Sequence, residues 1–412
     1  MSTPALSVVV PSRNTRDLTL ACLASLAAAE RERPELAGGG LEVVLVDDAG
    51  ADGTAEAVAA LHPRVRLLRL ASQGGFTVAA NRGLAAAAGE VLLLLNSDTE
   101  VEGAGLAAML ARFAAEPRLG IGGGALRYPD GTPQWSGGGE PGAVWCFALA
   151  SGLAQAAARL PLYRRLRPPS GSIRAGRLPH ERSEHPRLEH PQRGRGAPEA
   201  RGQGDPAGGA GDGSGQGDRA GGGDDGSGQG DRAARSAAPV AWVTGAAMAI
   251  RRAVWEQVGP LDERFRLYAQ DLDLCLRARD AGWTVAVLPE LRVLHHHGAT
   301  VAAESGGGRA GDGGAAARGN DGGGGRGAQR VELLWTDLLR WGSKRGGDRT
   351  ARRMARAFLA GGTLRWLGRC LATPFVPAGS RPAFRAATGA WRGALAAVRA
   401  WRKAEADGAA RP

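Results

Sequence analysis

The chain has 412 residues, enough for two or three domains, and carries a formal net charge of +11. Its 65 glycines, more than twice the usual share, indicate that part of the chain does not fold. The four cysteines lie far apart and no secretion signal is apparent, which argues against a disulfide-rich secreted protein and favours the cytoplasm. No apolar run of membrane-spanning length is apparent either, which argues against a transmembrane protein.

The first 115 residues alternate apolar runs with segments of helical periodicity. Strands are expected at residues 6–10, 41–46, 65–70 and 91–95, and helices at residues 17–29, 52–61 and 103–115, with an alanine-rich helix after the glycine turn at 74–75. Such alternation is typical of a parallel sheet with helices on its faces. The sequence therefore predicts an α/β fold.

Small polar side chains follow two of these strands at the point where each strand ends. Asp47 and Asp48 follow the second strand, and Asn96, Ser97 and Asp98 follow the fourth. In open α/β sheets, ligands bind in the crevice beyond the strand ends, where a carboxylate is suited to holding a divalent cation against phosphate oxygens. Taken alone, these residues fit turns that cap the following helices at least as well.

Two later tracts are poor in apolar residues. Residues 163–238 are mainly Gly, Arg, Pro, Asp and Ser and contain the repeat DGSGQGDRA twice, which predicts a disordered insert. The composition of residues 303–329 likewise predicts a glycine-rich disordered linker. Between them, residues 239–302 form a compact island with its own expected strands and helices. An island of this size needs a larger core, so we expect it to pack on residues 1–162.

Six motifs occur in a characteristic order. They are SVVVPSRN at residues 7–14, LVDDAGADGT at 45–54, GGFTVAANRG at 74–83, LLLLNSDTE at 92–100, DERFRLYAQDLDLCLRARDAGW at 262–283 and HHHG at 295–298. Together they resemble the family-2 glycosyltransferases, most closely the bacterial rhamnosyltransferase-like branch. The resemblance implies the GT-A nucleotide-diphospho-sugar transferase fold, with residues 1–162 as the nucleotide-sugar-binding half and residues 239–302 as the acceptor and catalytic-base half.

The resemblance also implies where the donor and its metal bind. It assigns nucleotide-sugar binding to residues near the strand ends and the glycine turn: Pro11, Ser12, Asp47, Asp48, Gly75, Asn81, Asn96 and Asp98. It assigns a divalent cation, Mg²⁺ or Mn²⁺, to Asp98 with His295, and with His296 in second place. Asn96 stands where a strict DxD motif has Asp, which implies weaker or more ligand-dependent metal binding.

Asp271 is the general base that the resemblance implies, because the family has an acidic pair at this position. Here the pair reads Gln270-Asp271, and Gln270 cannot take a proton. A helix N-terminus lowers the pKa of a carboxyl unless burial compensates. The alternative is that Asp271 only caps its helix.

Residues 330–412 hold the chain's charge excess, because residues 331–412 contain 16 Lys and Arg against 5 Asp and Glu. They also contain five of the ten tryptophans, in a region that we expect to be helical. Arginine with tryptophan is typical of helices lying on an anionic membrane surface. A helical appendage whose tryptophans pack on the domain explains the same composition equally well.

These observations predict a metal-dependent inverting glycosyltransferase that moves a sugar, rhamnose or another hexose, from a nucleotide-diphospho-sugar to a glycan or lipid-linked acceptor in cell-envelope polysaccharide synthesis. We expect it in the cytoplasm or peripherally on the inner face of the plasma membrane. Asn96 and Gln270 leave open a catalytically weakened homologue that only binds nucleotide-sugar. A nucleic-acid-binding protein is suggested only by the pI near 10.6, and no nucleic-acid partner is expected.

Overall fold

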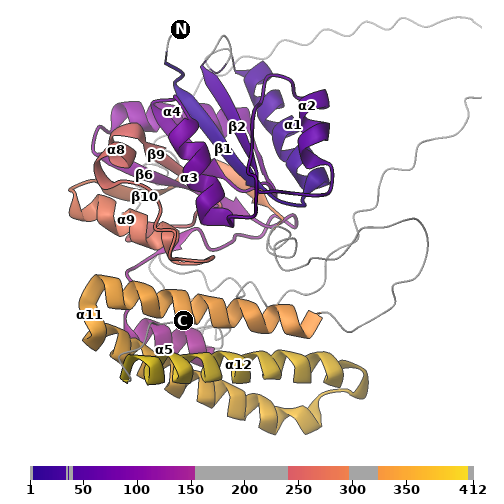
Figure 1. Ribbon diagram of the computed structural model, residues 1–412, viewed down its shortest axis with the longest axis vertical. Coiled ribbons are helices and arrows are strands. Elements are labelled where there is room, and N and C mark those ends of the chain that lie inside the picture. Colours follow the sequence, from indigo (N-terminus) through magenta and orange to yellow (C-terminus); the bar gives the residue numbers. More distant parts are fainter. Residues whose placement is uncertain (1–2, 34–35, 37–39, 154–239, 297–322, 407–412) are drawn as a thin grey trace, which may run out of the picture. The chain divides into compact units, whose positions relative to one another are not determined.

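A computed structural model describes residues 3–33, 36, 40–153, 240–296 and 323–406 (Figure 1). The predicted insert at 163–238 lies outside the described residues. Of the predicted linker at 303–329, only residues 323–329 are described, and they are helical.

The main sheet of the described residues has eight strands in the order β3-β2-β1-β4-β9-β6-β10-β5. β1 pairs in parallel with β2 and β4, β2 with β3, and β6 with β10, whereas β9 runs antiparallel to both of its neighbours and β5 antiparallel to β10. The strands are β1 (Leu6–Ser12), β2 (Leu41–Asp47), β3 (Arg66–Arg69), β4 (Val91–Leu95), β5 (Thr99–Val101), β6 (Leu119–Arg127), β9 (Ala247–Arg251) and β10 (Thr284–His295). The predicted fold class, an α/β fold with a mostly parallel sheet, is confirmed.

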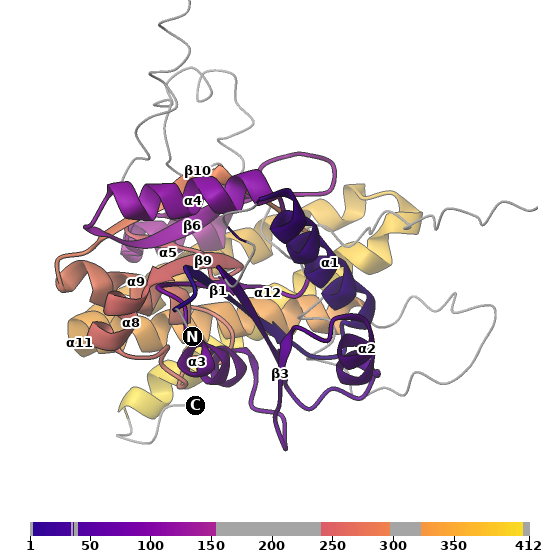
Figure 2. The ribbon, with the colours of Figure 1, turned by 90° about the horizontal axis from the view of Figure 1, so that it is seen from above.

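Helices cover both faces of this sheet because its strand residues alternate between two apolar cores. Val8 and Leu93 face a core with α1 and α4, whereas Val9 and Leu94 face a second core with α3 and α9 (Figure 2). The helices are α1 (Arg16–Glu32), α2 (Thr54–Leu61), α3 (Phe76–Ala86), α4 (Gly103–Ala115), α5 (Ala143–Ser151), α8 (Arg252–Val258) and α9 (Gln270–Asp280).

The island packs back on the first half, as the sequence predicts. β9 lies between β4 and β6, with Met248 opposite Leu94, and the long β10 extends the sheet beyond β6. β6 itself is not predicted from the sequence, because its run of glycines has little strand propensity. The glycines allow close packing, since a Cβ on Gly123 would lie 2.5 Å from the Val243 side chain.

The C-terminal region is helical, with α11 (Gly323–Ala372), two short 3₁₀ turns (Thr373–Phe375 and Ala378–Ser380) and α12 (Arg381–Ala406). At Gly347, with φ of 68°, α11 bends, and its two halves fold onto each other so that Trp335 stacks on Phe358 at 4.9 Å between ring centroids. The tryptophans Trp335, Trp341, Trp391 and Trp401 are buried. Their burial favours the packed-appendage interpretation of the tryptophans over insertion into a membrane.

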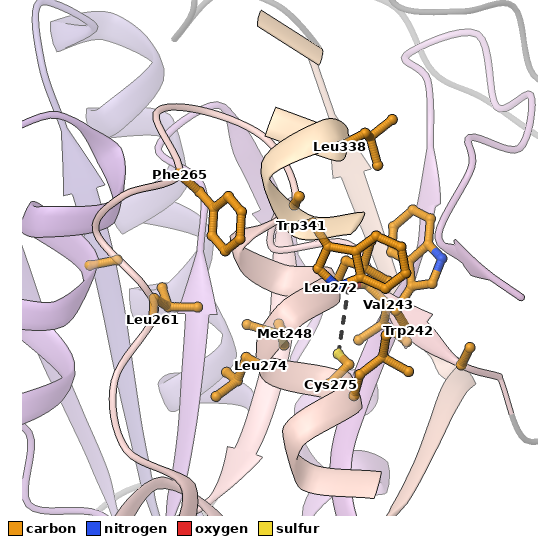
Figure 3. Packing of buried hydrophobic residues seen from close by; sticks show 14 of the residues in the cluster. Trp242, Val243, Met248, Leu261, Phe265, Leu272, Leu274, Cys275, Leu338 and Trp341 are labelled. Atoms are coloured by element: carbon orange, nitrogen blue, oxygen red, sulfur yellow. Dashed lines mark hydrogen bonds between the residues drawn. The ribbon is translucent and has the colours of Figure 1, made fainter. Parts of the chain in front are cut away.

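One apolar core joins this region to the island. Leu338 and Trp341 of α11 belong to the same cluster of buried residues as Phe265 and Leu272 (Figure 3). The helix α11 is therefore part of the fold around α9. Among the residues that the structure describes, no helix is both long and apolar enough to cross a bilayer.

Candidate active site

Asp98 and His295 come from distant parts of the chain and meet beyond the end of β4. β10 pairs with β5 so that His295 lies opposite Thr99, the residue after Asp98. His295 Nε2 then lies 3.3 Å from Asp98 Oδ1, and both side chains are more than nine-tenths buried. The structure therefore brings together the two residues that the sequence ranks first for metal binding.

Gln134 orients the His295 ring. Its Nε2 donates to the backbone carbonyls of Arg127 and His295, at 3.1 and 2.6 Å, which fixes the orientation of the amide. Gln134 Oε1 then lies 2.8 Å from His295 Nδ1, so Nδ1 carries the proton and donates it. Nε2 is left facing the Asp98 carboxylate, where either a proton or a divalent cation can satisfy both groups.

His296 does not join this pair. Neighbouring residues along an extended backbone point to opposite sides, and the His296 Nε2 lies 2.7 Å from Glu100 Oε1 instead. Only the backbone of His296 contacts Asp98, because its N–H donates to the Asp98 carbonyl at 2.9 Å. His296 is therefore not placed as a metal ligand, and His297 lies outside the described residues.

Asn96 lies between the end of β4 and Asp98, two residues before Asp98 in the chain. Its backbone N–H donates to the Ala246 carbonyl at 3.0 Å, and its side-chain Oδ1 is buried with no hydrogen-bond partner among the described residues. No group of three or more His, Cys, Asp or Glu that could hold a metal occurs in the described part of the chain. The residues still fit Mg²⁺ or Mn²⁺, because such ions are often held by one or two protein ligands together with substrate phosphates.

Hydroxyl groups connect the end of β1 with this loop. Ser12 Oγ lies 3.2 Å from Thr15 Oγ1, which lies 3.0 Å from Ser97 Oγ. Ser12 and Pro11 are themselves buried at the end of β1. Their contacts hold the loops of the site, and direct donor binding by either residue stays a prediction.

Asp47 and Asp48 bind the backbone of neighbouring turns. Asp48 accepts hydrogen bonds from the N–H groups of Gly74 and Gly75, at 2.6 and 2.9 Å, and so fixes the glycine turn where Gly75 adopts a φ of 84°. Asp47 accepts from Gly50 N–H at 3.0 Å, and burial raises the pKa of its carboxyl. These contacts shape the turns, as the alternative interpretation expects, and nucleotide binding by Asp47 and Asp48 stays a prediction.

Asn81 on α3 holds a loop of the island. Its Nδ2 donates to the Leu261 carbonyl at 2.9 Å and to Glu263 Oε1 at 3.0 Å, and its Oδ1 accepts from Leu261 N–H at 3.0 Å. The amide is thus engaged by residues 261–263. Its contacts give it a structural role, and contact with the donor stays a prediction.

Asp271 lies at the start of α9, close to the loop that carries Asn96. Asp271 Oδ2 accepts from Gly245 N–H at 2.9 Å, and the next residue, Ala246, accepts from Asn96 N–H. Asp271 Oδ1 accepts from Leu272 N–H at 2.8 Å. Burial raises the pKa of the Asp271 carboxyl, and this effect exceeds the lowering by the backbone hydrogen bonds. A general base at a helix N-terminus needs such a rise, because the helix N-terminus by itself lowers the pKa of a carboxyl.

Gln134 and Arg13 lie at the candidate site but are not predicted from the sequence. Two buried nitrogens of Arg13, Nε and Nη1, have no hydrogen-bond partner among the described residues, at the end of β1 where an anionic donor is expected. The place of Arg13 in the SVVVPSRN motif is the signal in the sequence that could have indicated this residue. Gln134 lies outside all six motifs, and only the pairing of β10 reveals its contact with His295.

Comparison with known proteins identifies relatives by sequence. A family model described as Glycosyl transferase family 2 matches residues 7–171, and another, described as Glycosyltransferase like family 2, matches residues 229–305. The chain is 28% identical over 285 residues to the N-acetylglucosaminyl-diphospho-decaprenol L-rhamnosyltransferase of Mycobacterium tuberculosis (strain ATCC 25618 / H37Rv), covering 66% of this chain and 70% of that protein. It is 37% identical over 113 residues to the succinoglycan biosynthesis protein ExoO of Rhizobium meliloti (strain 1021), covering 27% of this chain and 30% of that protein.

Solved structures with a similar fold share less sequence identity with this chain. A mannosyltransferase from Pyrobaculum calidifontis, in complex with GDP-Man and Mn²⁺, aligns with a TM-score of 0.46 and 14% identity over 97% of this chain and 87% of that one. GalNAc-T7 with UDP, GalNAc and Mn²⁺ aligns with a TM-score of 0.41 and 14% identity over 71% of this chain and 44% of that one.

Proposed function

The chain belongs to family 2 of the glycosyltransferases, near the rhamnosyltransferase branch, and we propose that it transfers a hexose, L-rhamnose first among them, from a nucleotide-diphospho-sugar to a lipid-linked or glycan acceptor. The Mycobacterium relative is named for rhamnosyl transfer to a lipid-linked sugar, and the Rhizobium relative for polysaccharide synthesis. Both names support an acceptor that belongs to cell-envelope polysaccharide synthesis.

The contact between Asp98 and His295 is the observation that carries the proposal of a metal-dependent donor site. Asp98, His295 and the buried Oδ1 of Asn96 would hold a Mg²⁺ or Mn²⁺ ion beyond the end of β4. When bound, the ion would neutralise the negative charge that develops on the diphosphate leaving group. Two nitrogens of Arg13 at the end of β1 have no hydrogen-bond partner among the described residues, and they suit the same anion.

Asp271 would act as the general base. Its carboxylate takes the proton of the acceptor hydroxyl while the hydroxyl oxygen attacks the anomeric carbon, and the nucleotide diphosphate leaves from the opposite face. A single displacement of this kind inverts the anomeric configuration and needs no covalent intermediate. The raised pKa of Asp271 supports this role, because a more basic carboxylate accepts a proton more readily.

The test is a donor panel followed by turnover. Thermal shift with UDP-, GDP- and dTDP-sugars in the presence of Mn²⁺ selects the donor, and transfer to an N-acetylglucosaminyl diphosphoprenol analogue is then measured for wild type and Asp271→Asn. We expect transfer with inverted anomeric configuration by the wild type and a fall of at least about 100-fold in the variant. A product with retained configuration, or an Asp271→Asn variant of full activity, would contradict the mechanism.

A catalytically weakened homologue is the second candidate, and Gln270 is the residue that motivates it. Gln270 is buried at the start of α9, where its Nε2 donates to the Leu267 carbonyl at 3.0 Å. Hydrolysis of the selected donor with Mn²⁺ separates the two candidates. A binding-only homologue would show the thermal shift but neither hydrolysis nor transfer above the Asp271→Asn level.

We also propose peripheral contact with an anionic membrane through the second half of α11. Residues 350–404 contain eleven Lys and Arg and no Asp or Glu. One exposed stripe of α11 at helical spacing carries Arg353 and Arg356 and then Leu364, Leu367 and Leu371. Basic and apolar side chains on one face suit the headgroup region of an anionic bilayer, where a lipid-linked acceptor would be found.

A further inference from the structure

The segment between Leu261 and α9 has no regular secondary structure, yet it leads directly to Asp271. Ala269, the last residue before α9, has a φ of 68°, a conformation that residues other than glycine rarely adopt. The backbone N–H groups of Leu267 and Tyr268 just before it have no helix or strand to bind. Contacts from other elements must hold the segment in place.

Asp337 of α11 supplies the missing acceptors. Its side chain is fully buried, and its Oδ2 accepts from Leu267 N–H at 3.1 Å and from Tyr268 N–H at 3.0 Å. Its Oδ1 pairs with Arg340 Nη1 at 3.0 Å, so the charged partner of the carboxylate lies in the same helix. A carboxylate that accepts two backbone N–H groups holds them more strongly than a neutral acceptor does.

Lys344, two turns further along the same face of α11, holds both ends of the segment. Its Nζ lies 2.8 Å from Asp262 Oδ2 and 2.8 Å from Asp273 Oδ1, one carboxylate at the start of the segment and one in the first turn of α9. Trp341 and Leu338 of α11 share the apolar core with Phe265 (Figure 3). The helix α11 thus contacts the segment at its start, its middle and its end.

From this geometry we infer that the first half of α11, before the bend at Gly347, belongs to the catalytic apparatus, with Asp337 as a positioning residue that holds residues 267–269 so that Asp271 meets the acceptor hydroxyl. The inference rests on the proposed role of Asp271 as general base. Loss of the carboxylate would free the strained turn at Ala269 and let the first turn of α9 move. Displacement of a reacting group by about 1 Å costs up to about 100-fold in rate.

The experiment is a double-mutant cycle on the full chain. We expect Asp337→Ala to lower kcat for transfer by about 10- to 100-fold, while the affinity for the donor selected by the panel, with Mn²⁺, stays unchanged because the Asp98 loop is not touched. In the Asp271→Asn background, Asp337→Ala should lower kcat by less than about twofold, because the group it positions is already gone. Asp337→Asn keeps an oxygen acceptor and should restore part of the activity.

Phe358→Leu is the matched control, because Phe358 lies in the second half of α11 and stacks on Trp335, so its change removes packing but no hydrogen bond or ion pair to residues 261–271. It should lower the Tm of the protein and leave kcat and donor affinity at wild-type values below the Tm. Wild-type kcat in a folded Asp337→Ala variant, or equal losses in both backgrounds of the cycle, would overturn the inference. Full activity of Asp271→Asn would instead overturn the proposed base, and the inference with it.

Discussion

Two adjacent histidines of the HHHG motif have different partners, which the strand geometry explains. His295 faces Asp98 and Gln134, whereas the ring of His296 faces Glu100. Side chains alternate along an extended strand, so only one of two neighbours can reach a given point. The motif predicts a metal site, and the pairing of β10 with β5 brings His295, and not His296, to the Asp98 carboxylate.

Asp98→Ala should abolish Mn²⁺-dependent donor binding. Changes in the partners of metal ligands already cost about 10- to 100-fold in metal affinity, so loss of a direct ligand should cost at least that much. Donor affinity is measured by calorimetry with and without Mn²⁺. Asp98 lies beyond the end of β4, so circular dichroism should show an unchanged fold.

Glu100→Ala is the control for this change. Glu100 lies two residues away, in β5, but its carboxylate contacts His296 and not the Asp98 pair. Its loss should leave Mn²⁺-dependent donor affinity unchanged. Equal effects of the two substitutions, or undiminished affinity in Asp98→Ala, would remove Asp98 from the site.

The pH dependence of turnover should report Asp271. A base must be deprotonated to act, and burial raises the pKa of this carboxyl above the ordinary aspartate value of about 3.9. As the pH falls through the raised pKa, Asp271 is protonated and kcat should fall, so the acid limb should lie above that of an exposed aspartate. The measurement is kcat at saturating donor, acceptor and Mn²⁺ across the pH range.

Asp280→Asn provides the comparison on the same helix. Asp280 is exposed at the far end of α9, and a hydrogen bond from Arg345 lowers the pKa of its carboxyl. This variant should retain the wild-type acid limb, whereas Asp271→Asn should lose turnover at every pH. An acid limb that moves with Asp280 would assign the titration elsewhere.

At the scale of elements, the C-terminal helices combine two surfaces. One side of α11 packs into the apolar core with Phe265 and Leu272, and another exposes arginines and leucines to solvent. Phe375, in the turn that follows, is 88% exposed and extends the apolar end of the exposed stripe. Because four of the five tryptophans in these helices are buried, the leucines, Phe375 and the arginines are the side chains that we expect to contact a membrane.

Replacing Arg352, Arg353 and Arg356 by glutamine should weaken binding to anionic vesicles. Each basic residue near such a surface contributes about 1 kcal/mol at physiological salt, so the loss should be about 2–3 kcal/mol. Sedimentation with phosphatidylglycerol vesicles and with neutral phosphatidylcholine vesicles measures it. Turnover on a soluble acceptor analogue should survive.

A charge-matched control separates local contact from net charge. Arg31, Arg64 and Arg118 are exposed and lie outside the C-terminal helices. Their replacement by glutamine removes the same charge and should change vesicle binding by less than the first triple variant does. If the two triple variants pellet equally at low salt, α11 does not form the membrane contact.

At the scale of the whole molecule, the two parts of the chain that build the main sheet are separated in the sequence by a long tract poor in apolar residues. Deleting residues 194–235 should leave transfer activity within about twofold of wild type, because a shorter connection changes loop-closure entropy little when its ends still reach. Activity and Tm are measured together. A soluble deletion variant without turnover would show that the tract binds the acceptor or covers the site.

Local patterns in the sequence determined the α/β class, the strands up to β4, the extent of α4 and the positions of Asp98 and Asp271. Apolar periodicity and turn residues act over a few neighbours, so they can be recognised without knowing the fold. The six motifs gave the family for the same reason, since each is a short run around a strand end or a helix start.

The tertiary structure alone decided which residues meet. β9 enters antiparallel between β4 and β6, the register of β10 brings His295 to Asp98 and Gln134, and Asp337 binds the backbone before Asp271. These contacts join residues far apart in the chain, and their formation depends on the burial of apolar surface over the whole domain. No local pattern encodes such pairings, because each depends on how all the elements pack together.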